Sequence, residues 1–344
     1  MKKNIPYRMK KKGGRWFSLF FLSLTCSVSA FAQWQVTRDN PQVAFHEVLP
    51  PGNYSGITHL YDDCYAMVSD KSSTDGFYLI RMKLDTLTAE ILQVENLGFR
   101  GDRMKHADCE AIAYCQDTQT LFISREANNT VAEYTLDGRC TGRQLQIPRI
   151  YGEQVGRNLG LESLAYSADR QLFWIINEGP LRCDSAYGQP LLRLQSFGLD
   201  MLPREQYAYA MDPPTVHGSA AHYAHGVSEL AALDNGGLLV LEREFYVPKT
   251  KIGARVICKI YEINPQQSSP VMPDAPLVPI SKRLVHQFTT TLTLFSRQMA
   301  NYEGMCFAPS LSDGSKPLIM VCDSQNRYAR VLKDWMKTLV LKPY

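Results

Sequence analysis

The feature that most constrains the fold is a hairpin pattern that recurs five times along the chain. Each copy has a short apolar stretch, a polar turn and a second apolar stretch that ends at an acidic residue. Val, Ile, Phe and Tyr on either side of turn residues predict β-hairpins. The five segments are Ser55–Asp70, Cys109–Glu126, Leu161–Glu178, Val227–Glu242 and Tyr302–Asp323.

The spacing of the copies predicts the architecture. Their anchor residues Gly56, Glu110, Glu162, Ser228 and Glu303 lie 52 to 75 residues apart, and further strand-like stretches fill the intervals. Four strands per unit at this spacing are typical of a β-propeller blade. We predict an all-β chain folded as a β-propeller of six blades with four antiparallel strands each, the sixth formed by about 280–297 together with both termini. Residues 33–344 would then be a single domain.

The first 32 residues have a different character from the rest. They hold seven Lys or Arg and no acidic residue, followed by an apolar stretch and Ala30-Phe31-Ala32. This pattern predicts a signal peptide cleaved before Gln33, and hence a secreted or periplasmic protein. The apolar stretch is short for a membrane-spanning helix, so we expect no transmembrane helix.

Charge and cysteine usage narrow the function. Without the leader, 30 basic residues face 34 acidic ones, a net charge of −4, so we expect no nucleic-acid partner. Eight cysteines follow the leader, several within apolar stretches and without C-x-x-C spacing, so we expect mostly buried thiols with one or two disulfides. We expect a monomer.

The repeat predicts that acidic residues gather at one end of the central channel, because the two ends of a hairpin lie side by side. Glutamates inside the apolar strands and acids at the strand ends are both candidates. Hard oxygen ligands favour calcium, with two asparagines as neutral donors. The predicted metal ligands are Glu110, Glu162, Glu303, Glu126, Glu178, Glu242, Asp323, Asn158 and Asn301, and Asp70 occupies the same repeat position.

Two readings of these acids remain open. In the first, the acids only cap strands by accepting hydrogen bonds from backbone N–H groups; in the second, they bind a cation and carry out chemistry. As an enzyme, the protein would use Glu110, Glu162 and Glu303 at the cation, and Arg125 and Arg243 to hold a small anionic ester. As a non-catalytic module, the same channel mouth would bind an unknown ligand or a protein. Histidines offer a weaker alternative for a transition metal, at His106 beside Asp108 or at His217, His222 and His225.

The motifs resemble one known family. They are Asp108-Cys-Glu110, Ser124-Arg-Glu126, Asn158-Leu-Gly-Leu-Glu162, Asn177-Glu178, Glu242-Arg243, Asn301-Tyr-Glu303 and Val321-Cys-Asp323. Together they resemble the exported phytase-like family, named for an esterase-like activity of phytase, over about residues 50–330. The resemblance implies hydrolysis of esters or phosphoesters. Ser228 departs from the pattern, because a serine stands where the repeat predicts an acid and Glu229 is shifted by one residue.

No familiar nucleophile accompanies the acids. The sequence lacks G-x-S-x-G, H-E-x-x-H, the P-loop and G-x-G-x-x-G. A hydrolase built on this chain would therefore activate water with a metal or a carboxylate.

Overall fold

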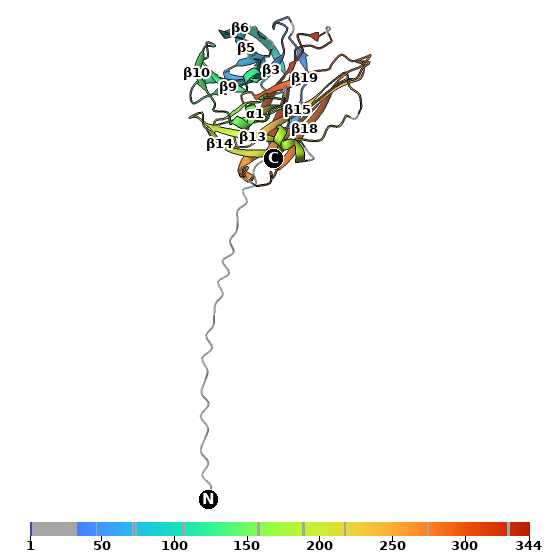
Figure 1. The fold of residues 1–344 in the computed structure, drawn as a ribbon. Helices are drawn as coiled ribbons and strands as arrows, with labels where there is room; N and C mark the ends of the chain where they lie inside the picture. The colour runs from blue at the N-terminus through green and yellow to red at the C-terminus, as the bar shows by residue number, and fades with distance from the viewer. Residues whose placement is uncertain are drawn as a thin grey trace. The chain divides into compact units, whose positions relative to one another are not determined.

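Five antiparallel sheets, four of them four-stranded and one five-stranded, surround a central channel in the computed structural model (Figure 1). The structure describes residues 1, 33–45, 47–70, 72, 74–105, 108–156, 159–187, 190–216, 218–273, 275–328 and 331–344, without the side chains of 102–105 and 185–187. Residues 32–344 form one compact unit. The predicted signal peptide lies outside the described residues apart from Met1.

Each sheet is one blade, and the strands run from the channel outward. Blade 1 contains β3 (Tyr54–Tyr61), β4 (Cys64–Ser69), β5 (Thr74–Leu84) and β6 (Ile91–Lys105); blade 2 contains β7 (Cys109–Cys115), β8 (Thr120–Arg125), β9 (Thr130–Tyr134) and β10 (Cys140–Gln144); blade 3 contains β11 (Ala165–Ser167), β12 (Leu172–Ile176), β13 (Leu191–Gly198) and β14 (Pro203–Ala210). Blade 4 contains β15 (His222–Ala232), β16 (Leu238–Val247), β17 (Ala254–Ile263) and β18 (Lys282–Leu292); blade 5 contains β19 (Asn301–Phe307), β20 (Lys316–Asp323), β21 (Trp335–Pro343) and β1 (Trp34–Asp39), with β2 (Val43–Ala44) also on β21.

Helices contribute little to the fold. One α-helix and three 3₁₀ turns occur among the described residues, all in connections between strands. They are α1 (Arg149–Gln154), η1 (Glu126–Asn128), η2 (Arg182–Tyr187) and η3 (Pro265–Gln267).

The β-propeller prediction is confirmed, but the expected sixth blade is wrong for the part of the chain that the structure describes. The segment assigned to that blade forms β18, the outer strand of blade 4. The predicted closure by both termini does occur, because N-terminal β1 pairs with C-terminal β21 in blade 5. The long fourth repeat reflects the proline-containing connection from β17 to β18, which stays within one blade, rather than an additional blade.

Contacts between blades make up the core. Side chains of successive strand residues point to opposite faces of each sheet, so every blade packs against both neighbours. Five hydrophobic clusters result, one at each junction between adjacent blades. All eight described cysteines are free thiols and six of them are buried, so the predicted buried thiols are found, without the expected disulfides.

The innermost strands approach one another closely at one end of the channel. A Cβ atom on Gly56 of β3 would lie 2.8 Å from Cα of Ala111 in β7, and one on Gly304 of β19 would lie 2.8 Å from the Ser55 carbonyl oxygen. Backbone atoms cannot yield as a flexible side chain can. These glycines therefore allow blades 5, 1 and 2 to close around a narrow channel.

We expect Gly56→Ala to lower the free energy of unfolding by about 1–3 kcal/mol, because the added methyl group overpacks the contact between β3 and β7. Urea unfolding would measure the loss. Gly152→Ala is the control, since a Cβ there meets nothing within 4 Å and alanine favours helix α1. Equal stability of wild type and Gly56→Ala would contradict the close approach.

Candidate metal centre at the channel mouth

Two glutamates of the innermost strands, Glu110 and Glu303, lie at β-bulges. Glu110 interrupts the register between Cys109 and Ile112, and Glu303 interrupts it between Tyr302 and Gly304. A bulge leaves its extra residue outside the regular pairing and redirects its side chain. Blades 1 and 4 have bulges at the corresponding places, occupied by Ser55 and Ser228. The same bulge position is therefore filled by a glutamate in blades 2 and 5 and by a serine in blades 1 and 4.

A second ring of residues ends the second strands. In blades 1 to 3, an acid follows the second strand, and its backbone N–H donates to a carbonyl oxygen two or three residues before the anchor residue of the repeat. The donors are Asp70, Glu126 and Glu178, at distances of 3.0, 2.9 and 3.0 Å. In blades 4 and 5, strand pairing places one residue each at the corresponding position of the second strand. The ring consists of Asp70, Glu126, Glu178, Arg243 (opposite Gly226) and Asp323 (opposite Asn301).

Blade 4 therefore contributes Arg243 to this ring, and the prediction that Glu242 joins the other acids is wrong. Adjacent strand residues point to opposite faces, so Glu242 faces the junction of blades 3 and 4. Its carboxylate accepts from the Tyr209 hydroxyl at 2.6 Å, the Asp212 backbone N–H at 3.1 Å and the Lys282 ammonium at 2.5 Å. Glu242 is a structural link between two blades.

Arg243 lies among three of the predicted acids. Its guanidinium is 2.6 Å from the Glu303 carboxylate, 3.0 Å from Glu178 and 3.9 Å from Glu162. Asn301 connects to the same group, since its Oδ1 accepts from Arg243 at 3.0 Å and its Nδ2 donates to Glu303 at 2.8 Å. Arg243 thus neutralises carboxylates and leaves little capacity for an anionic ester.

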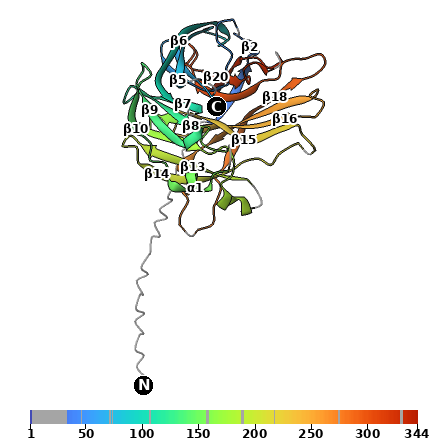
Figure 2. The same ribbon diagram turned by 45° about the horizontal axis from the view of Figure 1, so that its top comes forward.

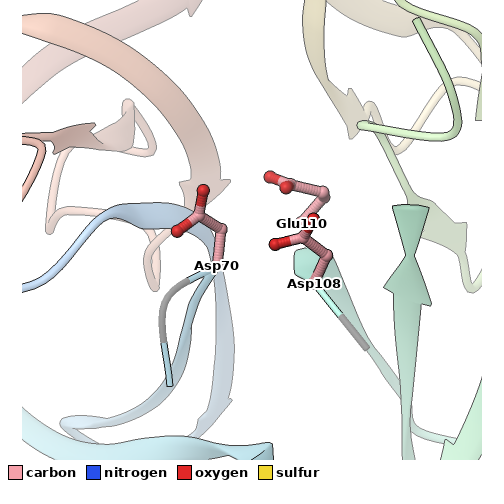
Figure 3. Close-up of side chains that lie close together, drawn as sticks. All are labelled: Asp70, Asp108 and Glu110. Carbon is pink, nitrogen blue, oxygen red and sulfur yellow. The ribbon is translucent and has the colours of Figure 1, made fainter. Parts of the chain in front are cut away.

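Three further carboxylates lie close together beside the ion pairs of Arg243. Oxygens of Asp70, Asp108 and Glu110 all lie within 4.8 Å of one another, with Asp70 from blade 1 facing the other two from blade 2 (Figure 3). Oxygens on opposite sides of a calcium ion are about 5 Å apart, since each bond measures about 2.3–2.6 Å. The three side chains fit such an ion in spacing and in charge. No other trio of His, Cys, Asp or Glu this close occurs among the described residues.

The remaining predicted residues divide between the centre and its surroundings. Glu126 accepts from the Gly160 N–H at 3.2 Å and, with Asp108, lines a cleft of about 190 Å³. Asp323 accepts from the Gln325 N–H at 2.5 Å. Asn158 lies outside the described residues, as do His106 and His217, while His222 and His225 lie on β15, where His225 is paired with Glu244.

Arg125, which the sequence predicted near the acids, lies elsewhere. Arg125 is buried between blades 1 and 2, 3.5 Å from the Asp75 carboxylate and 3.0 Å from the Thr130 hydroxyl. Its contacts lie within the junction of these two blades, so the prediction that it holds an ester at the channel mouth is wrong. Arg327 pairs with Asp334 at 2.5 Å. Arg243, by contrast, does contact three of the acids, Glu162, Glu178 and Glu303.

Burial and mutual repulsion raise the pKa values of these acids. Burial raises the pKa of Glu110 well above its usual range, and Glu303 and Asp70 add to the rise. Burial also raises the pKa of Glu162, with a further contribution from Glu178. For Glu303, burial outweighs Arg243 and brings the pKa to about 8, and burial brings the pKa of Asp323 to about 6. Without a cation, this centre therefore retains protons at neutral pH.

We expect the metal-free protein to lose stability as the pH rises from about 5 to 8. A carboxyl has a pKa near 4 in the unfolded chain, so the folded state holds the Glu303 and Asp323 protons more tightly. Their stabilising contribution is complete below pH 4 and is lost as the pH passes 6 and then 8. Urea unfolding in the presence of a chelator would measure this slope. The slope should flatten in Glu303→Gln; an unchanged slope would contradict the assignment to Glu303.

The sequence pointed to Glu110 but not to the trio around it. Asp70 was visible as a strand-ending acid and Asp108 as a neighbour of Glu110, yet the prediction did not single out these three among the acids at the channel mouth. The signal that could have found them is the repeat itself, since Asp108 immediately precedes the first strand of its hairpin and Asp70 follows the second strand of the preceding one.

Solved structures with similar folds are distant in sequence. A streptogramin B lyase is 12% identical with a TM-score of 0.38, covering 88% of this chain and 98% of that chain. Virginiamycin B lyase from Staphylococcus aureus is 10% identical with a TM-score of 0.37, covering 90% and 99%. An endo-arabinase from Bacteroides thetaiotaomicron VPI-5482 is 10% identical with a TM-score of 0.44, covering 86% and 96%. No curated protein matches the chain significantly.

A family profile gives the assignment. It is described as "Esterase-like activity of phytase" and matches residues 50–325. That range spans all five inner strands and both rings of acids. The chain belongs to the phytase-like family.

Proposed function

We propose that the protein is a cation-dependent hydrolase of esters or phosphoesters, with its active site at the acidic end of the channel. The observation that carries this proposal is the convergence of carboxylates. Oxygens of Asp70, Asp108 and Glu110 lie within 4.8 Å of one another, and burial raises the pKa values of Glu110 and of the nearby Glu162 and Glu303. Such a cluster requires protons or a cation, and a site that uses both is suited to acid–base chemistry.

Asp70, Asp108 and Glu110 would hold the cation, for which calcium is the proposed identity. A bound divalent cation would supply positive charge that polarises an ester and lowers the pKa of water. This assignment differs from the sequence prediction, in which Glu110 shared the ion with Glu162 and Glu303. The latter two lie on the Arg243 side of the centre.

Glu162 and Glu303 would move protons. Their raised pKa values keep them protonated near neutral pH, which is the state a general acid needs. Arg243 fixes the orientation of both side chains and keeps either one from becoming an isolated buried charge. The cleft of about 190 Å³ beside Asp108 and Glu126 is the proposed place for one part of a small ester.

Turnover of a chromogenic ester panel, both phosphate and carboxylate, would test this function. The protein would be assayed as isolated, after chelation, and after return of calcium. We expect activity to disappear on chelation and to return with calcium, and Glu303→Gln to lower kcat more than calcium affinity. Calcium binding without turnover of any ester would instead identify a non-catalytic binding module.

We also propose that the protein is exported. This rests on the basic and apolar pattern of residues 1–32. Among the described residues, no helix has the length and apolar character needed to cross a bilayer. Mass spectrometry of secreted material should find an N-terminus near Gln33, and retention of Lys2 to Arg15 would refute the proposal.

A further inference from the structure

A tight turn after β18 presents two large apolar side chains to solvent. The Thr293 N–H donates to the Ser296 carbonyl at 2.8 Å, and the Thr293 hydroxyl accepts from the N–H groups of Phe295 and Ser296. Leu294 and Phe295 occupy the two corner positions and are 74% and 100% exposed. Gly, Asn, Asp and Ser usually occupy such corners, so this turn is unusual for a surface in contact with water alone.

A second turn adds to the same apolar tip. The Gly253 N–H donates to the Leu292 carbonyl at 2.8 Å, which places the β16–β17 connection beside the turn after β18. Ile252 in this connection is 51% exposed. We call Ile252, Leu294 and Phe295, with the two turns that carry them, the blade 4 tip.

Basic residues surround the apolar side chains of the tip. Lys249, Lys251 and Arg297 are all exposed. Neither 245–256 nor 287–302 contains an acidic residue, although residues 33–344 as a whole carry a net charge of −4. The tip is therefore a locally cationic, apolar projection on an otherwise acidic protein.

The tip lies at the same end of the propeller as the acidic centre. Strand β16 continues for four residues beyond Arg243, about 13 Å at ~3.3 Å per residue, before the chain turns. The loop after Asp323 reaches the tip as well, since the Lys251 ammonium is 3.4 Å from the Tyr328 hydroxyl. The strands of blade 4 extend outward in Figure 2.

We propose that the blade 4 tip binds the surface of an anionic lipid bilayer. Ile252, Leu294 and Phe295 would enter the boundary between headgroups and acyl chains, while Lys249, Lys251 and Arg297 would lie at the lipid phosphates. Charge selects this partner: basic residues flanking exposed apolar side chains suit an interface that offers phosphate above hydrocarbon. The convex shape of two adjacent turns also suits insertion between lipids. This inference does not depend on the proposed cation or on catalysis.

A local fluorescence probe would test the proposal in the full-length chain. Phe295→Trp, mixed with vesicles of phosphatidylglycerol and phosphatidylcholine, should show a blue shift and quenching by brominated acyl chains beyond the wild-type signal. Leu87→Trp is the matched control, because Leu87 is 73% exposed in the β5–β6 turn at the opposite end of the propeller. No vesicle-dependent change at position 295, or an equal change at position 87, would overturn the proposal.

Salt and charge variants would identify the lipid chemistry. Binding of Phe295→Trp should weaken about tenfold or more in 0.5 M salt and on vesicles of phosphatidylcholine alone. It should weaken by about the same factor when Lys249→Gln and Lys251→Gln are added, since each basic residue near an anionic surface contributes about fivefold to binding. Equal binding to neutral and anionic vesicles would contradict the proposed role of charge. Sedimentation would measure the oligomeric state and test the alternative partner. A dimer that dissociates when Leu294→Ser and Phe295→Ser are introduced would assign the tip to a second copy of the chain instead of a bilayer.

Discussion

Glu110→Gln should lower calcium affinity by at least about tenfold and abolish calcium-dependent turnover. The amide keeps the shape of the side chain but loses the charge that a hard cation selects, and Asp70 and Asp108 alone do not form a complete set of carboxylate ligands. Isothermal titration of chelator-treated protein at pH 8 would measure the change, because protons then compete less with calcium.

Glu229→Gln is the matched control for this experiment. Glu229 is also a buried carboxyl of an inner strand, 1% exposed, with a pKa that burial raises well above its usual range. Its Oε1 accepts from the N–H groups of Leu164 and Leu230 at 3.1 and 3.0 Å, which an amide oxygen can also do. Calcium affinity should remain within about twofold of wild type. An equal loss in both variants would show that the effect arises from general disturbance of the channel.

Glu162→Gln distinguishes between the two assignments of the metal ligands. If the ion lies at Asp70, Asp108 and Glu110, calcium affinity should change much less than in Glu110→Gln, while turnover falls. If Glu110, Glu162 and Glu303 share the ion, as the larger set of ligands predicted from the sequence has it, the two variants should lose affinity equally. That result would contradict the trio seen in the structure.

Arg243→Met should destabilise the metal-free protein by about 3–5 kcal/mol at pH 7.5. Removing the guanidinium leaves Glu178, and the fraction of Glu303 that is ionised at this pH, buried without their closest positive partner, and such uncompensated charges are costly. Lowering the pH to 5 should reduce the loss, since protonation then neutralises the acids. Urea unfolding at both pH values would measure it.

Arg125→Met provides the comparison. Arg125 is likewise buried, but it contacts Asp75 at 3.5 Å, away from the raised-pKa acids. We expect a smaller loss with little change between pH 5 and 7.5. A loss for Arg243→Met below about 1 kcal/mol, or one that does not depend on pH, would contradict its role as the neutralising group of the acidic centre.

The architecture was predictable because its signals are local. Turn residues between apolar stretches define each hairpin, and the repeat spacing leaves room for two further strands, so a propeller followed from neighbouring residues. The number of blades did not follow, because a long connection within blade 4 lengthens the repeat as an additional blade would. Closure depends on how many sheets can pack side by side around one channel, a property of the whole molecule.

The acidic end of the channel also followed from the sequence, whereas the partners within it were decided by register. A bulge at Ser228 sets the pairing of Arg243 with Gly226, so that Arg243 joins the ring of acids and Glu242 faces the next blade. Asp70 and Asp108 meet Glu110 because two blades close against each other, although 38 residues separate Asp70 from Asp108. The sequence by itself thus determined the strands and the type of side chain that ends them. Only the tertiary structure decided which of those side chains meet, since a one-residue shift reverses the direction of a strand side chain and distant residues are brought together only by blade packing.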